Sequence, residues 1–136
     1  MKKPSDLIIE RNRAFEQGDF GFVFDTFHPE SNFRRQFSDS DEYIAFAESN
    51  LVRDFKIIDC EILHERVLGD DAQVIFLMEM KAQGVVQKYA ELAWLKRESS
   101  QWRYHRGLKV THEDLPDNPD SLSFECFENL DQSTIF

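Results

Sequence analysis

The hydrophobic pattern of this chain changes its period once, close to residue 55. Before that point, apolar residues recur at the three- and four-residue spacing of amphipathic helices, and after it they alternate with polar residues to about residue 110. Each period places apolar side chains on one face only in its own conformation, helix or strand. The chain therefore predicts an α+β fold in which a block of helices precedes a block of antiparallel strands.

Two helices are expected before Pro29. By residue type Ser5 caps the first helix, and Gly18 ends it at about residue 17. Asp19 opens the second helix, which stops before Pro29 because proline disfavours a helical residue in front of it. The apolar residues that share a face are Leu7, Ile8, Ala14 and Phe15 in the first helix, and Phe20, Val23, Phe24 and Phe27 in the second.

A third helix is expected after the polar stretch from residue 30 to residue 38. Either Ser38 or Ser40 caps it by residue type. The residues that then share its apolar face are Tyr43, Ile44, Ala47 and Leu51. With the helical hairpin before it, this helix completes a layer of three N-terminal helices that can cover one face of a sheet.

Three turn signals divide the alternating region into four strands. They are Gly69-Asp70-Asp71, Gln83-Gly84 and Glu98-Ser99-Ser100. Short turns join antiparallel neighbours, so we expect a curved four-stranded antiparallel sheet, a cone wrapped around a helix. Both faces of the strands carry apolar residues, and both are therefore expected to be covered.

Alternation assigns each strand residue to one of the two faces. One face of the first strand is expected to hold Ile58, Cys60, Ile62, His64, Arg66 and Leu68. In the second strand, Val74, Phe76, Met78 and Met80 oppose Ile75, Leu77, Glu79 and Lys81. In the third strand, Ala90, Leu92 and Trp94 oppose Tyr89, Glu91, Ala93 and Leu95. The last strand places on one face Trp102, Tyr104, Arg106, Leu108 and Val110.

Residues 113–136 form an acidic C-terminal tail. They hold seven acidic residues and no Lys or Arg, and prolines at positions 116 and 119 favour an extended start. The apolar residues that can dock on the body or on a second subunit are Leu122, Phe124, Cys126, Phe127 and Leu130. We expect one domain at residues 1–112, followed by a tail that is either a solvated terminus, a segment that docks on a basic partner, or a cover for a pocket.

The charge of the chain argues against two classes of partner. A formal net charge of −10 repels phosphate backbones and anionic lipids, so neither nucleic acid nor a membrane is expected as a partner. No apolar run approaches the roughly 20 residues that a membrane span needs. The two cysteines, Cys60 and Cys126, are far apart and form no CxxC motif, which is typical of free thiols in a cytoplasmic protein.

Several local patterns occur in order between residues 5 and 110. They are Arg11 with Ala14-Phe15, Gly18-Asp19, Thr26-Phe27-His28-Pro29, Glu91 within an aromatic strand, Trp102-Arg103-Tyr104, and Gly107. In this order and spacing they resemble the middle domain of the YchJ-like proteins, which belongs to the nuclear-transport-factor-2-like, or cystatin-like, superfamily. The resemblance implies a cone-shaped α+β fold with a small-molecule pocket at its open end and a homodimer formed through the sheet.

The resemblance implies no particular activity. Full-length YchJ-like proteins carry Cys-rich SEC-C metal motifs, which this chain lacks, so their zinc-binding role does not transfer. The four histidines and two cysteines form no close chelating pair, and no metal site or cofactor is expected. No nucleophile elbow or phosphate-binding glycine loop is present either.

Arg11 and Glu91 are the first candidate site residues. Arg11 shares the helical face of Leu7 and Ala14, which points a guanidinium toward the sheet, and a buried charge of this kind needs a partner. Glu91, between Ala90 and Leu92 in the third strand, is the expected partner. The pair is either an internal ion pair that ties helix to sheet or part of an anion-binding or acid–base site.

The other candidates are aromatic residues, cations and histidines. His28, just before Pro29, either caps the second helix or belongs to a ligand site as a general acid or base. His64 is a packed sheet residue or, facing the cone with Tyr104, a general base. Trp102 and Arg106, on the expected face of Tyr104, form either an aromatic and cationic floor for an anionic or carbonyl ligand or, for Trp102, a packing contact with the long helix.

These residues support two functional hypotheses. The first is a non-enzymatic dimeric domain that binds a small molecule or a protein segment in its cone. The second is an isomerase, dehydratase or hydrolase with His64 or Glu91 as base and Tyr104 as hydrogen-bond donor. An enzyme needs at least two polar groups that converge within about 3 Å of one substrate atom, so the content of the cone separates the two.

Overall fold

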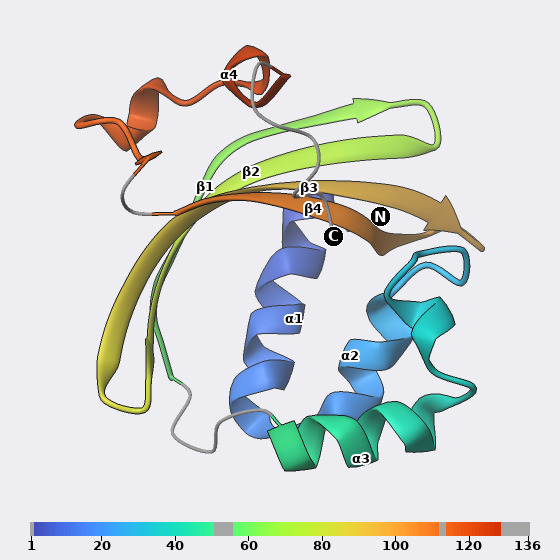
Figure 1. The fold of residues 1–136 in the computed structure, drawn as a ribbon. Helices are drawn as coiled ribbons and strands as arrows, with labels where there is room; N and C mark the ends of the chain where they lie inside the picture. Colours follow the sequence, from blue (N-terminus) through green and yellow to red (C-terminus); the bar gives the residue numbers. More distant parts are fainter. Residues whose placement is uncertain (1, 51–55, 112–113, 129–136) are drawn as a thin grey trace.

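Three helices pack against one face of a four-stranded antiparallel sheet, which curves around the first helix (Figure 1). The structure, a computed structural model, describes residues 2–50, 56–111 and 114–128. The helices are α1 (Pro4–Gln17), α2 (Phe20–Thr26) and α3 (Ser40–Asn50), with a short 3-10 helix, η1 (Arg34–Gln36), before α3. The strands are β1 (Lys56–Leu68), β2 (Asp71–Ala82), β3 (Val85–Glu98) and β4 (Gln101–Thr111), in the order β1-β2-β3-β4. The predicted α+β cone is confirmed.

Helix α1 begins two residues earlier than a cap at Ser5 would allow, with Lys3 at the cap position. Pro4 occupies the first helical position, which suits a residue without an N–H, and the backbone N–H of Lys3 donates to Asp6 Oδ2 at 2.9 Å. Ser5 lies inside the first turn, and its own N–H donates to Glu65 Oε2 at 3.0 Å. The cap predicted at Ser5 is therefore wrong. Gly18 ends the helix as predicted, with a left-handed φ of 72°.

Acidic residues cap the other two helices. Asp19 accepts a hydrogen bond from the backbone N–H of Phe22 at 3.2 Å, which confirms the predicted start of α2. Asp39, and neither Ser38 nor Ser40, accepts from the N–H of Glu42 at 2.9 Å and begins α3. Ser38 lies one residue too early, and its backbone N–H donates to the Glu42 side chain. Of the face predicted for this helix, Tyr43 and Ala47 are buried, Ile44 is half-buried, and Leu51 lies outside the described residues.

Two of the predicted hairpin turns have the same backbone conformation. Gln83 and Gly84 have φ values of 53° and 79°, and Ser99 and Ser100 have φ values of 51° and 69°. Two consecutive residues with positive φ form the hairpin turn whose twist matches that of the strands. Each turn joins neighbouring antiparallel strands in the predicted order.

The sheet separates two apolar clusters, one on each face. The inner cluster, between the sheet and the helices, includes Leu7, Ile8, Val23, Phe24, Tyr43, Val74, Phe76, Met78, Leu95, Trp102 and Tyr104. The outer cluster includes Ile75, Ala90, Leu92, Leu108, Val110, Leu122 and Phe127. The faces predicted for β2 and β3 are confirmed, because both strands pair without an irregularity.

In β1 an irregularity of register reverses the predicted face. Ile62 pairs with Phe76 of the inner cluster, but His64 pairs with Ile75 of the outer cluster. Leu63 is the extra residue between them, and it packs on the outer cluster. A bulge of one residue moves every following side chain to the other face. The prediction that His64 shares a face with Ile62 is therefore wrong.

An irregularity of register between β3 and β4 has the same effect in β4. Tyr104 pairs with Leu95, but Arg106 pairs with Trp94, which faces the other way. His105 is the extra residue, so Trp102 and Tyr104 belong to the inner cluster whereas Leu108 and Val110 belong to the outer one. The prediction of a single face from Trp102 to Val110 is wrong beyond Tyr104.

The C-terminal tail docks on the outer face of the sheet (Figure 1). It contains η3 (Pro119–Ser121) and α4 (Phe124–Glu128), in which Phe127 is buried against the outer cluster together with Leu122. The guanidinium carbon of Arg66 lies 4.0 Å from the centre of the Phe124 ring. Leu130, also predicted to dock, lies outside the described residues. The tail was predicted to dock either on the body of its own chain or on a second subunit, and in the structure it docks on the body of its own chain.

Among the described residues, no helix is long and apolar enough to span a lipid bilayer. The longest, α1, has 14 residues and buries the charged side chain of Arg11. A span of the hydrocarbon core takes about 20 predominantly apolar residues.

Phe127→Ala is expected to lower the free energy of unfolding by about 3 kcal/mol, because it removes a fully buried phenyl ring from the outer cluster. Thermal denaturation followed by circular dichroism should show a fall of several degrees in Tm. Phe22→Ala is the matched control, since that ring is 38% exposed and its loss should cost much less. A Phe127→Ala variant that melts with the wild type would show that the tail contributes nothing to the fold.

Candidate functional site

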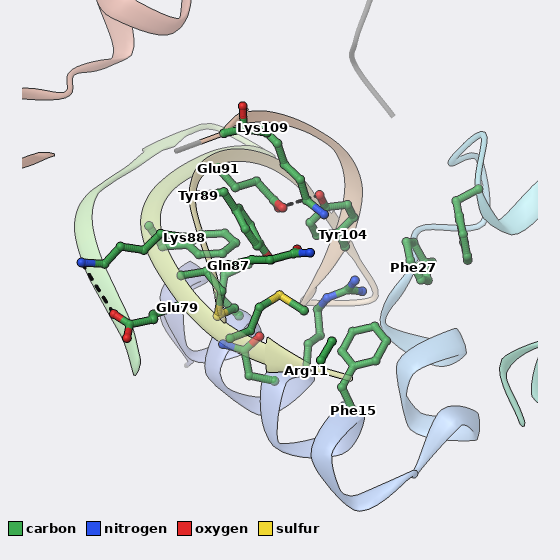
Figure 2. Close-up of a pocket in the computed structure, with 18 of the residues that line it drawn as sticks. Arg11, Phe15, Phe27, Glu79, Gln87, Lys88, Tyr89, Glu91, Tyr104 and Lys109 are labelled. Carbon is green, nitrogen blue, oxygen red and sulfur yellow. Dashed lines mark hydrogen bonds and ion pairs between the residues drawn. The ribbon is translucent and has the colours of Figure 1, made fainter. Parts of the chain in front are cut away.

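A cavity of about 1160 Å³ lies between the helices and the inner face of the sheet (Figure 2). Phe and Met side chains form much of its wall and leave its interior open. The apolar residues that line it include Ile8, Phe15, Phe20, Phe33, Met78 and Met80. The polar ones include Arg11, Asn12, Tyr89, Glu91, Tyr104 and Lys109. A wall of this kind, apolar with a few polar groups, is typical of small-molecule sites.

Arg11 lies at the centre of the polar wall. It is only 8% exposed, and its Nη1 donates to Thr26 Oγ1 at 2.6 Å. Its guanidinium carbon lies 4.4 Å from the ring centre of Phe27 and 4.3 Å from that of Tyr104. Burial lowers the pKa of Arg11, and the electrostatic influence of Tyr104 opposes this. A guanidinium keeps its charge even so, and the cavity wall therefore contains a fixed cation.

Tyr104 and Glu91 form a buried hydrogen-bonded pair. The phenol of Tyr104 donates to Glu91 Oε2 at 2.7 Å, and the Glu91 residue is 5% exposed. Burial raises the pKa of Glu91, and Lys109, Tyr104 and Arg11 offset this only in part. Burial also raises the pKa of Tyr104 well above that of a free phenol. The pair can therefore offer a ligand both a neutral phenol and a carboxyl that exchanges its proton above the usual range.

Tyr104 stands where a direct ion pair between Arg11 and Glu91 was expected. Its ring contacts the guanidinium and its hydroxyl contacts the carboxyl. Among the described residues, Arg11 takes Thr26 as its hydrogen-bond acceptor. The prediction that both groups face the cone is correct, but Tyr104 joins them in place of a salt bridge.

Lys109 and Tyr89 also belong to this wall, and the sequence pattern missed both as site residues. Lys109 pairs with Glu91 across the β3–β4 ladder, and its Nζ lies 4.7 Å from the centre of the Tyr89 ring. Figure 2 shows the lysine side chain directed toward Tyr104. Strict alternation from Tyr104 would place Lys109 on the outer face. Only the extra residue at His105 turns it inward.

Three predicted site residues lie away from the cavity. His64 is on the outer face, with its ring centre 6.2 Å from that of Phe124. Arg106 is also on that face, over the ring of Trp94. Trp102 is on the inner face but is buried at the far end of β4, where it does not line the cavity. The predicted roles of His64 as a base in the cone, and of Arg106 and Trp102 as its floor, are therefore wrong.

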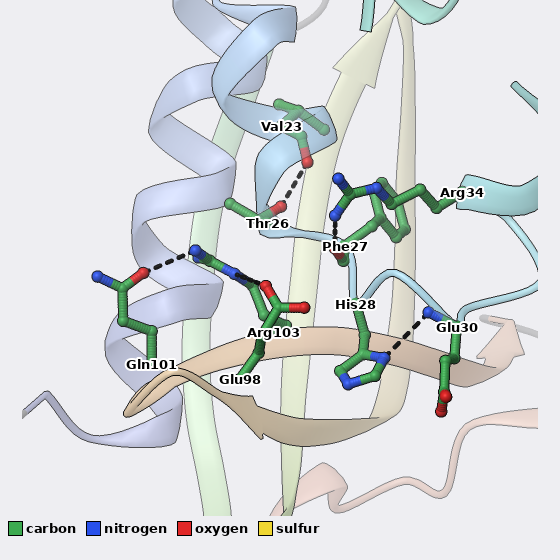
Figure 3. Close-up of polar contacts among 9 residues, drawn as sticks. All are labelled: Val23, Thr26, Phe27, His28, Glu30, Arg34, Glu98, Gln101 and Arg103. Carbon is green, nitrogen blue, oxygen red and sulfur yellow. Dashed lines mark hydrogen bonds and ion pairs between the residues drawn. The ribbon is translucent and has the colours of Figure 1, made fainter. Parts of the chain in front are cut away.

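His28 neither caps α2 nor lines the cavity. Its Nδ1 accepts a hydrogen bond from the backbone N–H of Glu30 at 3.1 Å, so this nitrogen cannot donate to the helix end (Figure 3). Its backbone N–H donates to the carbonyl of Tyr104 at 2.8 Å. Arg34 takes the role predicted for His28, because its longer side chain reaches back and Nη1 donates to the carbonyl of Phe27 at 2.8 Å.

No group of three or more His, Cys, Asp or Glu side chains that could hold a metal ion is found in residues 2–50, 56–111 and 114–128. Arg11, Lys109, Glu91 and the phenols of Tyr89 and Tyr104 lie in the polar wall of the cavity, a set suited to an anion or a carbonyl more than to a metal.

Comparison with known proteins identifies related sequences and folds. The sequence model of the family described as "YchJ, middle NTF2-like domain" matches residues 3–107. The fold is similar to the solution structure of RPA3114, a SEC-C motif containing protein from Rhodopseudomonas palustris, with 23% identity and a TM-score of 0.60 over 76% of each chain. No curated protein matches this chain.

Tyr104→Phe is expected to lower the free energy of unfolding by about 1 to 3 kcal/mol, because Glu91 loses its hydrogen-bond donor while the ring over Arg11 remains. Urea denaturation measures the change. Tyr89→Phe serves as the control, since the described residues offer its hydroxyl no hydrogen bond. Equal losses in the two variants would mean that the bond to Glu91 adds nothing to stability.

Glu91→Gln is expected to change how stability depends on pH. The carboxyl faces Tyr104, Lys109 and Arg11, and its folded pKa is raised above the ordinary value of 4.5. Its contribution to stability is therefore fully present below that value and is lost as the pH rises through the raised pKa. The wild type should lose stability relative to the variant over this interval. Denaturation at a series of pH values tests this, and a constant difference between the two proteins contradicts it.

Proposed function

Since the chain belongs to the YchJ middle NTF2-like domain family, we propose that it is a small-molecule-binding domain whose ligand occupies the cavity on the inner face of the sheet. The observation that carries the proposal is the cavity itself, about 1160 Å³ in volume, with Arg11, Tyr104 and Glu91 in its otherwise largely apolar wall. Ligand pockets of small-molecule-binding proteins are usually several hundred to about a thousand Å³ and have this kind of lining.

The open interior needs an explanation that packing alone does not give. Protein interiors are normally close-packed, and an unfilled apolar space loses dispersion contacts on every side. Phe46 and Val86 at the rim are 43% and 56% exposed, although both are apolar. A ligand that fills the cavity would restore these contacts and cover this rim. The polar groups lie inside the cavity, where a compact molecule reaches them more readily than a peptide segment does.

A homodimer formed through the sheet is the second part of the proposal. The tail covers part of the outer face, and we place the partner copy at the edge strand β1. Three apolar residues of β1 are exposed there, Ile58, Val67 and Leu68. Burial of apolar residues such as these is the usual driving force of dimer formation.

An acid–base enzyme is the alternative function, favoured by one observation. Glu91 and Tyr104 are 2.7 Å apart at the cavity wall, and the carboxyl has a raised pKa, as general acids and bases near neutral pH often do. Both groups can reach one carbonyl or hydroxyl of a ligand. Conversion of a bound ligand that is lost in Glu91→Gln would favour this alternative over simple binding.

Met80→Trp is expected to block ligand binding, because an indole at this position occupies cavity volume. The probe is N-phenyl-1-naphthylamine, a neutral apolar dye whose fluorescence increases when it leaves water. Asp71→Trp is the matched control, since this residue is exposed at the opposite end of the same strand and does not line the cavity. The wild type and the control should bind the dye, and the Met80 variant should bind it at least about tenfold more weakly. Equal binding by all three proteins would place the dye outside the cavity.

A further inference from the structure

We infer that the natural ligand is an amphipathic carboxylic acid, whose carboxylate binds Arg11 and whose apolar chain extends through the cavity toward its rim at Phe46 and Val86. This inference rests on the proposed function and names the chemical class of the ligand. Three features of the cavity carry it: the balance of charge on its wall, the donors of Arg11, and the separation of its polar end from its apolar rim.

The charged side chains of the wall favour an anion. Glu79 and Lys88 lie 3.6 Å apart and balance one another. Around Glu91 are two cations, Arg11 and Lys109, and the carboxyl of Glu91 takes a hydrogen bond from a neutral phenol. Even if Glu91 is ionised, this part of the wall has more positive than negative charge. An anionic head group is attracted here, and a cationic one is repelled.

Arg11 has the donors that a carboxylate needs. A guanidinium carries five N–H groups, and the acceptor that the described residues offer Arg11 is the hydroxyl of Thr26. The rings of Phe27 and Tyr104 lie against the group and provide no comparable acceptor. A ligand that accepts hydrogen bonds from two further N–H groups of this guanidinium gains affinity, because bonds to a charged group are stronger than those between neutral groups. A carboxylate does so with the matching geometry.

The apolar end of the cavity lies some distance from this head-group site. Met80 and Phe15 line the space between, and Phe46 and Val86 form the exposed rim. Val86 and Glu91 are on the same strand, β3, and five residues of strand span about 17 Å. A ligand with its charge at Arg11 therefore needs an apolar body of that length to cover the rim, which fits a long alkyl chain better than a small metabolite.

Three probes of equal chain length test the inference: dodecanoate, dodecanol and dodecyltrimethylammonium, each below the concentration at which it forms micelles. Isothermal titration calorimetry on the full chain measures their Kd values. Dodecanoate should bind at least about tenfold more tightly than dodecanol, the factor expected for one charge-assisted hydrogen bond. The ammonium probe should bind most weakly of the three.

Two variants of β4 locate the head group. Lys109→Gln removes a cation from the cavity wall and should weaken dodecanoate several-fold while leaving dodecanol unchanged. Arg106→Gln removes a cation from the outer face of the same strand and should change neither. Arg11→Gln should have the largest effect on dodecanoate, with circular dichroism to verify that the variant is folded. If Arg11→Gln does not fold, the comparison of Lys109→Gln with Arg106→Gln still tests the position of the head group.

Each outcome separates the inference from the proposed function. Equal Kd values for dodecanoate and dodecanol would overturn the carboxylate but leave a cavity that binds apolar molecules. Tighter binding of the ammonium probe would overturn it in favour of Glu91 as the anchor of a cation. If no probe binds and the naphthylamine dye does not bind either, the cavity is not a ligand site and both conclusions fail.

Discussion

The inner layer of this protein is arranged around one buried cation, the guanidinium of Arg11. A charge in such a place is tolerated only where other groups compensate for the water it has lost. Thr26 provides an acceptor from α2, and the rings of Phe27 and Tyr104 provide electron-rich surfaces from the end of α2 and from β4. The backbones of these last two residues also form a bridge, so the segment after α2 is attached directly to the sheet. One side chain thus requires α1, α2 and β4 to meet at a single point.

The same requirement explains why the cone stays open. Side chains that surround a cation with aromatic faces and a phenol cannot also fill the space in front of it with aliphatic groups. The bond from Tyr104 to Glu91 extends the polar wall across the sheet, and Lys109 extends it further along β4. The hydrophobic core is therefore divided between the helix side, which retains a cavity, and the outer face, which the tail closes with Leu122 and Phe127.

The sequence predicted the elements well because their hydrophobic periods are distinct, and it predicted Arg11, Glu91 and Tyr104 as residues of the cone. It failed where a single extra residue changes the face of a strand. Leu63 and His105 are residue types that are also found in regular strands, so nothing in the sequence marks either position as a bulge. For that reason His64 and Arg106 were assigned to the cone and Lys109 was overlooked. Helix caps were missed for a related reason, because neighbouring residues of similar capping ability, such as Ser38, Asp39 and Ser40, compete within one turn.

The bulge in β4 has a mechanical consequence. Lys109 points into the cavity only because Leu108 and Val110 point away from it, into the surface on which the tail rests. The polar wall of the cavity and the surface on which the tail docks are thus opposite faces of the same few residues of β4. A partner that lifts the tail would release the outer side of this segment and loosen the lysine on the inner side. The two surfaces of the sheet would then be coupled without a hinge and without movement of the helices. A small tilt of this one strand displaces side chains on both of its faces.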